Sequence, residues 1–181
     1  PNGNCNQTEK WNGTNWTEVN DLNTSRRNIS GCGIQTSALG FGGYQDSGGP
    51  PTSEFFALTE SWNGTNWTEV NDLNLGRNNL AGAGNTNTNA LAYGGNHSPS
   101  PAGKAETELW NGTNWTEVND LNQSRRGLAG AGIYTSALAF AGSADGTPTA
   151  PSLTEQWNGT NWTEVADLSS GKNGMAGFGT T

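Results

Sequence analysis

Short stretches in which apolar and polar residues alternate recur along this chain. The phrase WNGTNWTEV occurs four times without change, beginning at Trp11, Trp62, Trp110 and Trp157. Successive copies are 51, 48 and 47 residues apart, a period typical of repeat architectures. No segment places apolar residues at helical spacing over the length of an ordinary helix. The pattern therefore predicts an all-β fold.

Each repeat predicts four short strands. The first is a run of small residues, LAGAG at 80–84, which recurs in similar form at 29–33, 128–132 and 175–179. The second alternates Leu and an aromatic residue with Ala or Gly, at 38–41, 90–93 and 137–140. Small side chains suit the crowded centre of a radial assembly, where neighbouring sheets converge.

The third and fourth strands are predicted to form a hairpin in every copy. In the second copy Glu60 and Trp62 precede the pair Asn63-Gly64, and Trp67 and Glu69 follow it. Asn-Gly is a strong hairpin signal because a type I′ turn needs positive φ at both central residues. A two-residue turn sets Glu60 opposite Trp67, whereas a four-residue turn sets it opposite Glu69. Because like charges across a ladder are unfavourable, we expect the two-residue turn.

Sheets of this kind need neighbours. A lone four-stranded sheet cannot bury both faces, but sheets stacked face to face around an axis can. We therefore expect a β-propeller of four-stranded antiparallel blades, as a partial ring or one completed by further blades from the same or another chain. The repeats divide the chain into a partial blade at 1–23, blades at 24–73, 74–121 and 122–168, and the start of another at 169–181.

Several recurring positions resemble kelch repeats. The kelch pattern has a Gly doublet ending the second strand, a Tyr in the third, a Trp opening the fourth and a basic residue before the next blade. The matching residues are Gly42-Gly43 and Gly94-Gly95 for the doublet, Trp16, Trp67, Trp115 and Trp162 for the Trp, and Arg26, Arg77, Arg125 and Lys172 for the basic residue. Two features depart from it: Ala141-Gly142 breaks the doublet, and Trp stands in place of Tyr at Trp11, Trp62, Trp110 and Trp157.

The repeated phrase WNGTNWTEVNDLN also resembles repeat-rich virion and tail-fibre proteins of marine tailed phages. That resemblance implies a virion or extracellular location. Together the two resemblances imply a kelch-like propeller in a virion or extracellular setting.

Composition explains how such a chain can have a core. Only 31% of its residues are hydrophobic and 27 are Gly, so the eight recurring Trp residues are expected to supply much of the buried surface. The formal net charge is −8, and 12 of the 16 acidic residues belong to the repeated motif. No run of Lys or Arg could neutralise a string of phosphates, which argues against nucleic-acid binding.

The residue inventory offers little for catalysis. His97 is the only His, and the copper oxidases that share the kelch repeat need His ligands. Cys5 and Cys32 match no zinc spacing and are too few for a disulfide framework. No apolar run is long enough to span a bilayer. We expect a non-enzymatic protein with no cofactor, no metal and no membrane span.

The repeats differ most between the second and third strands, at 44–56, 96–104 and 143–152. Exposed connections of this kind carry recognition, so they provide the candidate ligand-binding residues. These are Tyr44, Phe55, Phe56, Asn96 and His97. The alternative for the Phe residues is packing over a neighbouring blade.

A second candidate site is a ring of basic residues. Arg26, Arg77, Arg125 and Lys172, with Arg27 and Arg126 beside them, fall at one edge of successive blades. Guanidinium groups in a ring could hold carboxylates or sulfated sugars through bidentate bonds. The alternative is that each cation pairs with a repeated Glu or Asp of its own or an adjacent blade.

These features predict a binding module that presents variable loops on a rigid disk to a surface glycan or a protein receptor. The main alternative is a purely structural component of a larger assembly, where the blades fill space or bridge subunits. A designed consensus repeat protein would also contain identical phrases.

Overall fold

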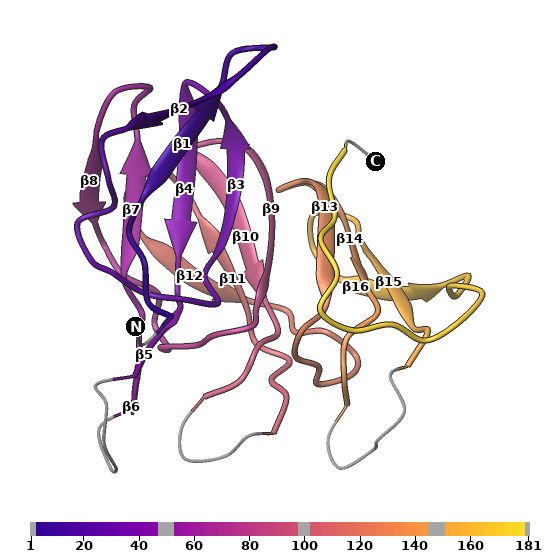
Figure 1. Cartoon of the computed structure of the whole chain (residues 1–181). Coiled ribbons are helices and arrows are strands. Elements are labelled where there is room, and N and C mark those ends of the chain that lie inside the picture. Colours follow the sequence, from indigo (N-terminus) through magenta and orange to yellow (C-terminus); the bar gives the residue numbers. More distant parts are fainter. Residues whose placement is uncertain (1–2, 47–52, 98–101, 145–150, 180–181) are drawn as a thin grey trace.

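The computed structural model describes residues 3–46, 53–97, 102–144 and 151–179. Within these ranges the chain forms sixteen β-strands and no helix (Figure 1). All strand pairs are antiparallel, in five sheets of two or four strands. The expectation of an all-β fold built from four-stranded antiparallel sheets is therefore confirmed.

Three sheets have four strands each and the same strand order along the chain. Sheet A consists of β3 (Ser30–Ile34), β4 (Ser37–Phe41), β7 (Thr59–Trp62) and β8 (Trp67–Val70). Sheet B consists of β9 (Ala81–Thr86), β10 (Asn89–Tyr93), β11 (Thr107–Trp110) and β12 (Trp115–Val118). Sheet C consists of β13 (Ala129–Ile133), β14 (Ser136–Phe140), β15 (Thr154–Trp157) and β16 (Trp162–Val165).

Two smaller sheets flank this core. The N-terminal hairpin pairs β1 (Thr8–Trp11) with β2 (Trp16–Val19), which match the third and fourth strands of the larger sheets. A second hairpin, β5 (Tyr44–Asp46) and β6 (Ser53–Phe55), lies inside the first predicted loop. The C-terminal segment 175–179 was expected as another first strand. It has no strand geometry, although Gly132 N–H donates to Gly179 O at 2.8 Å.

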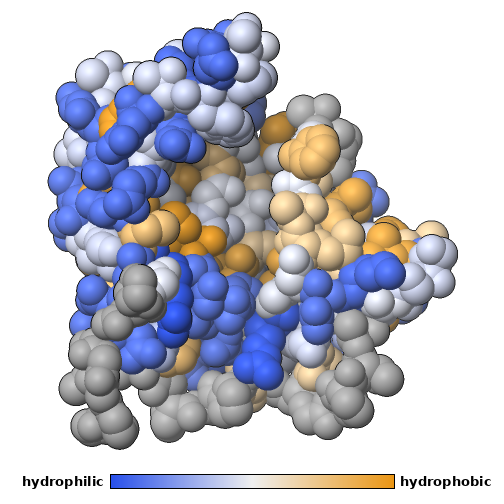
Figure 2. Space-filling view, in the orientation of Figure 1, coloured by the Kyte–Doolittle hydropathy of each residue, from blue (hydrophilic) through white to orange (hydrophobic). Residues whose placement is uncertain are grey.

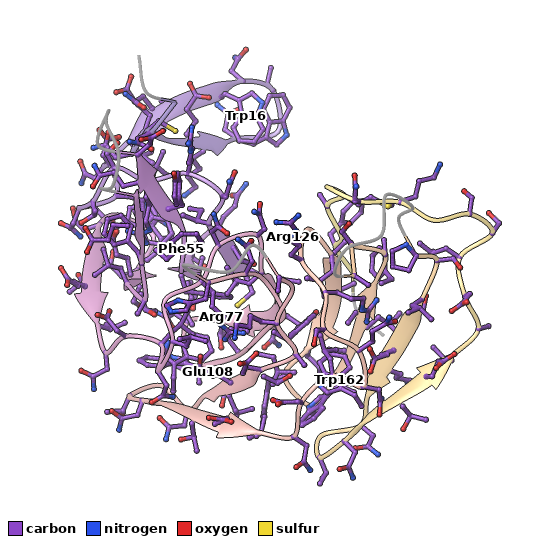
Figure 3. The ribbon with its side chains drawn as sticks, turned by 90° about the horizontal axis from the view of Figure 1, so that it is seen from below. Trp16, Phe55, Arg77, Glu108, Arg126 and Trp162 are labelled. Carbon is purple, nitrogen blue, oxygen red and sulfur yellow. The ribbon has the colours of Figure 1, made fainter. Side chains whose placement is uncertain are left out.

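The first strands of the sheets lie side by side. β9 contacts both β3 and β13, and the sheets fan out from these strands in an open arc when seen from below (Figure 3). A cavity of about 370 Å³ lies between them, lined by small residues of β3, β9 and β13 and by residues 177–179. A Cβ at Gly82 would lie 2.5 Å from Cζ of Phe41. The side chains of the inner strands are therefore small because an aromatic residue of the preceding sheet packs against these strands.

The expected hairpin register is wrong. In sheet A, Trp62 pairs with Trp67 and Glu60 with Glu69, around a four-residue turn, and the other copies share this register. The Asn63 carboxamide oxygen accepts hydrogen bonds from Thr65 N and Asn66 N, each at 2.9 Å, so Asn63 closes an Asx turn. The two Trp rings pack with centroids 5.3 Å apart.

The repulsion between Glu60 and Glu69 that argued against this register is relieved by a third residue. Arg26 forms an ion pair with Glu60. A neutralised, buried Glu60 no longer disfavours Glu69 opposite it, and the paired Trp rings favour the observed register. The strand bounds also shift by a residue or two at several ends.

The indole of the fourth strand joins each sheet to the preceding one. Trp115 Nε1 donates to Thr59 Oγ1 at 2.9 Å and Trp162 Nε1 donates to Thr107 Oγ1 at 3.0 Å. Trp67 Nε1 makes the same bond to Thr8 of the N-terminal hairpin. Trp115 also packs against Phe41 with ring centroids 5.1 Å apart. Each junction thus combines aromatic burial with one satisfied indole N–H.

Identical Trp residues differ in environment because of this arrangement. Trp162 is 5% exposed between sheets B and C, whereas Trp16 is 64% exposed on the N-terminal hairpin. Trp16 still packs against Trp11, with ring centroids 5.5 Å apart.

We predict that Trp162→Ala lowers the free energy of unfolding by about 3–5 kcal/mol, because it opens a cavity between two sheets. Trp16→Ala, at the same repeat position, should cost about 1 kcal/mol or less. Urea unfolding followed by circular dichroism measures both. Equal losses of unfolding free energy would show that the position of a Trp in the repeat, and not the residues packed against it, determines its contribution to stability.

Candidate functional site

The connections between the second and third strands of sheets A, B and C leave the molecule at one edge, the lower edge in Figure 1. We call the described parts of 42–58, 94–106 and 141–153 the loop face. Gly42 and Gly43 begin the first connection with φ of 68° and 115°. Positive φ at both positions turns the chain out of β4, a conformation that Gly adopts without strain. In sheet C, Ala141 takes the first of these positions with φ of 62°.

Three of the predicted ligand-binding residues lie together on the loop face. Tyr44 and Phe55 pair across β5 and β6, with ring centroids 5.3 Å apart in an edge-to-face arrangement. His97 comes from the next connection, and its ring centroid is 6.1 Å from that of Phe55. His97 Nδ1 lies 2.6 Å from Gly76 O, which orients the imidazole. Figure 3 shows where Phe55 lies on this face.

A cation extends this group. The Arg27 guanidinium carbon lies 4.9 Å from the Tyr44 ring centroid, and Arg27 Nη2 lies 3.5 Å from Asp46 Oδ2. We call Arg27, Tyr44, Phe55 and His97 the loop-face cluster. All four side chains are half-buried. The cluster therefore offers aromatic surface beside groups able to form hydrogen bonds.

The two other candidate ligand-binding residues, Asn96 and Phe56, make contacts within the fold. Asn96 is 6% exposed, its backbone pairs with Asn78, and its Oδ1 accepts a hydrogen bond from Asn79 Nδ2 at 3.2 Å. Phe56 is half-buried and its N–H donates to Gly43 O at 2.9 Å. Neither residue belongs to the loop-face cluster.

Three residues of the predicted basic ring have buried side chains. The side chains of Arg26, Arg77 and Arg125 are 0% exposed, and they pair with Glu60, Glu108 and Glu155 of the same sheets. The N–O distance is 2.8 Å in the pairs of sheets B and C. These guanidinium groups have no surface with which to bind a ligand. These three Arg residues instead follow the alternative expectation, in which each cation pairs with a repeated Glu of its own blade.

In sheets B and C the Arg of the buried ion pair also holds the two ends of a variable connection. In sheet B, Arg77 Nη1 donates to Gly94 O at 2.8 Å and to Glu106 O at 2.6 Å, the first and last residues of the connection. Arg125 donates to Ala141 O and Leu153 O in the same way. We call these contacts loop clamps. Figure 3 shows Arg77 and Glu108 of one clamp.

A recurring Asn completes each clamp. Asn74 donates from its backbone N and its Nδ2 to Glu108 Oε2, at 2.7 and 2.8 Å. The role of this residue was not predicted from the sequence, although Asn23, Asn74 and Asn122 recur at the same repeat position. A search for recurring polar residues would have found it. The carboxylate therefore accepts charge-assisted bonds at both of its oxygens.

Burial changes the pKa of the clamp cations. Desolvation lowers the pKa of Arg77 below its usual value, while the negative charges of Glu108 and Glu106 oppose that effect. The pKa of Arg125 is lowered for the same reason, and Glu155 opposes it. Removal of the Glu partner would leave an uncompensated buried cation.

The remaining basic residues are at the surface. Lys172 stands at the repeat position of the clamp Arg but is exposed. Arg126 is half-buried, and its backbone pairs with Ser143 of the loop face (Figure 3).

The described residues contain no group of three His, Cys, Asp or Glu side chains that could hold a metal ion. No helix long and apolar enough to cross a membrane occurs in the described ranges. Both Cys5 and Cys32 are free thiols.

We predict that Arg77→Met lowers the free energy of unfolding by about 3–5 kcal/mol, because Glu108 remains buried without its cation. The double variant Arg77→Met/Glu108→Leu should recover much of this loss, since no buried charge remains. Thermal and urea unfolding measure both variants.

Lys172→Met is the matched control at the equivalent exposed position, and we expect it to change stability by about 0.5 kcal/mol or less. A double variant as unstable as Arg77→Met would contradict a clamp based on charge compensation.

Cys32 packs between sheets A and B, and burial raises the pKa of its thiol to about 12. Because the thiolate is the reactive form, we predict that iodoacetamide modifies Cys32 at least ~100-fold more slowly in the folded protein than in urea. Peptide mass spectrometry over time distinguishes Cys32 from the exposed Cys5. Equal rates in both conditions would contradict the raised pKa of the half-buried Cys32 thiol.

No protein-family model matches the chain, and no curated protein matches it by sequence. Among solved structures 156 chains match, so the fold is common and does not indicate one activity. One of them, described as "Structure of YjhT", superposes with a TM-score of 0.77 at 11% sequence identity. The match covers 96% of this chain and 66% of that one, so this chain spans about two-thirds of its length. The comparison shows a propeller-like fold.

Proposed function

We propose that the chain is part of a kelch-like β-propeller, completed by further blades, that acts as a non-enzymatic binding module through its loop face. The loop-face cluster carries this proposal. Three predicted ligand-binding residues from two separate connections come together there, since Phe55 packs against both Tyr44 and His97.

The division between scaffold and loops supports a binding role. The Trp hairpin is identical in every copy, while the connections differ in length and sequence. Loop clamps hold both ends of the connections in sheets B and C on buried Arg residues. A rigid frame with independent loops allows recognition to change without loss of the fold.

The chemistry of the cluster suits a surface glycan or a protein receptor in a virion or extracellular setting. The Tyr44 and Phe55 rings supply apolar surface, and Arg27 and His97 supply polar atoms at its rim. Binding sites commonly combine an apolar area with a few placed polar groups. Aromatic and Arg side chains are also enriched where binding energy is concentrated.

A structural role in a larger assembly is the second candidate. Exposed apolar residues gather toward the two ends of the arc: Trp11, Trp16, Ile29, Ile34, Met175 and Phe178 are 38–93% exposed. Figure 2 shows apolar surface around the central hollow of the molecule. Large exposed apolar side chains at these ends favour contact with other protein. Completion of the ring by further blades would cover it.

The test is binding of the purified chain to a glycan array and to candidate receptor proteins. We predict that Tyr44→Ala/Phe55→Ala weakens the binding at least tenfold, since the loss of two aromatic contacts costs more than about 1.4 kcal/mol. Phe178→Ala, exposed and outside the loop face, is the control and should bind as the wild type does.

Equal binding by the double variant and the wild type would place recognition elsewhere. No binding to any glycan or receptor would favour the structural role.

A further inference from the structure

We propose that Arg126 binds the carboxylate of an acidic sugar in a pocket at the centre of the loop face. This inference deepens the proposed function and rests on it, because it names the class of ligand that the loop face recognises. Arg126 does not belong to the loop-face cluster, so variants at the two places can be tested separately.

Arg126 differs from the other Arg residues in its charge partners. Of the five Arg residues in the chain, three form the buried ion pairs with Glu, and Arg27 pairs with Asp46. Arg126 is half-buried and pairs with no acidic side chain in the part of the chain that the structure describes. A guanidinium group has five N–H donors and no acceptor. An unpaired, half-buried guanidinium therefore favours an anionic ligand.

The equivalent residue of sheet A, Arg27, shows how the fold can occupy a cation at this repeat position. The backbone of Arg27 pairs with Tyr44, and that of Arg126 pairs with Ser143, each just after the two residues with positive φ. The Arg27 guanidinium lies over the Tyr44 ring and reaches Asp46. The described residues of the third connection, 141–144 and 151–153, include neither an aromatic nor an acidic residue. They leave the donors of Arg126 to a ligand.

A pocket of about 300 Å³ adjoins Arg126, and we call it the central pocket. Its lining comes from the residues just before the first strands and from the first residues of those strands: Asn28, Ile29, Asn79, Leu80, Gly127, Leu128, Gly174 and Met175. Gly127 follows Arg126 in the chain. Figure 3, which looks onto the loop face, shows Arg126 near the centre of the arc.

Backbone hydrogen bonds fix the rim of the central pocket. Asn79 N–H donates to Asn28 O at 3.2 Å, and Gly127 N–H donates to Asn79 O at 2.8 Å. Gly174 N–H continues the series with a bond to Gly127 O at 2.8 Å. Each bond joins neighbouring repeats, so the rim is held in place before a ligand binds.

The polar side chains of the pocket suit the hydroxyl groups of a sugar. Asn79 Nδ2 donates to the side-chain oxygens of Asn78 and Asn96, at 3.3 and 3.2 Å, which orients the Asn79 carboxamide. Asn28 is exposed at the rim. Carboxamides both donate and accept hydrogen bonds, as hydroxyl groups do. The pocket thus offers amide groups beside one cation.

The charge of the whole chain argues for a ligand with few negative charges. The formal net charge is −8, so a nucleic acid or a strongly acidic protein would be repelled as it approached. One guanidinium can hold one carboxylate through two parallel hydrogen bonds. A sugar with a single carboxylate meets both conditions.

Cellobiouronic acid, a disaccharide with one glucuronic acid residue, is the probe, and neutral cellobiose is its matched control. Phenylglyoxal modifies accessible guanidinium groups, and peptide mass spectrometry measures the rate at each Arg. We expect Arg126 to be modified fastest, because the other four Arg residues have acidic partners. Cellobiouronic acid should slow that modification saturably, whereas cellobiose should not.

Calorimetry with cellobiouronic acid tests the residue directly. Arg126→Gln should weaken binding about tenfold or more, and Arg126→Lys should recover only part of that loss because an ammonium group lacks the planar fork. Lys10→Met removes the same charge from β1, away from the loop face, and should bind as the wild type does.

Asp145 stands at the repeat position of Asp46 and lies outside the described residues. Asp145→Asn should leave binding of cellobiouronic acid unchanged if Arg126 is available to the ligand. An Asp145→Asn variant that binds about tenfold more tightly would show that Asp145 occupies Arg126, and the proposal would be overturned.

The proposal also fails if cellobiouronic acid does not bind, if cellobiose binds equally well, or if Arg126→Gln binds as the wild type does. Sodium sulfate at equal ionic strength that protects Arg126 equally well would show a general anion site and overturn the assignment to a sugar. The proposed function has its own test in the Tyr44→Ala/Phe55→Ala variant, so a failure at Arg126 is distinguishable from a failure of the loop face.

Discussion

The indole of each fourth strand is the contact on which the structure depends. The sheets are short and poor in aliphatic residues, and their inner strands have side chains too small to make a core of their own. Trp115 and Trp162 cross the junctions between sheets, pack on an aromatic residue of the preceding sheet and donate a hydrogen bond to its Thr. Because both junctions between four-stranded sheets repeat this contact, stability is expected to come from pairs of neighbouring sheets, as in other repeat proteins.

A second constraint keeps the variable loops from disturbing these junctions. Each loop clamp buries an Arg against a Glu of its own sheet, and in sheets B and C the same Arg binds the carbonyl groups at both ends of the connection. The residues between those ends can differ while the frame stays the same. This separation explains how identical hairpins coexist with unlike loops, and it supports the proposal that the loop face binds a ligand.

The sequence predicted most of the architecture because its repeat is long and its strands are marked by turns. It failed at the hairpin register, because repulsion between Glu60 and Glu69 was judged without Arg26, which lies 34 residues from Glu60 in the chain. The Asx turn at Asn63 and the Trp62–Trp67 pair then favour the longer turn. The loop-face cluster could be predicted only as separate candidates. Phe55 and His97 belong to different connections, and only the folded arrangement brings their rings together.

Thr107 and Thr154 provide the most direct test of the junction. Thr107 Oγ1 accepts the bond from Trp162, whereas Thr154 Oγ1 is buried at the same repeat position with no partner among the described residues. The measurement is the free energy of unfolding of Thr107→Val and Thr154→Val. If the junction works as described, Thr107→Val loses about 1–3 kcal/mol because the Trp162 N–H is left unsatisfied, and Thr154→Val is neutral or stabilising. Equal losses in the two variants would contradict the account.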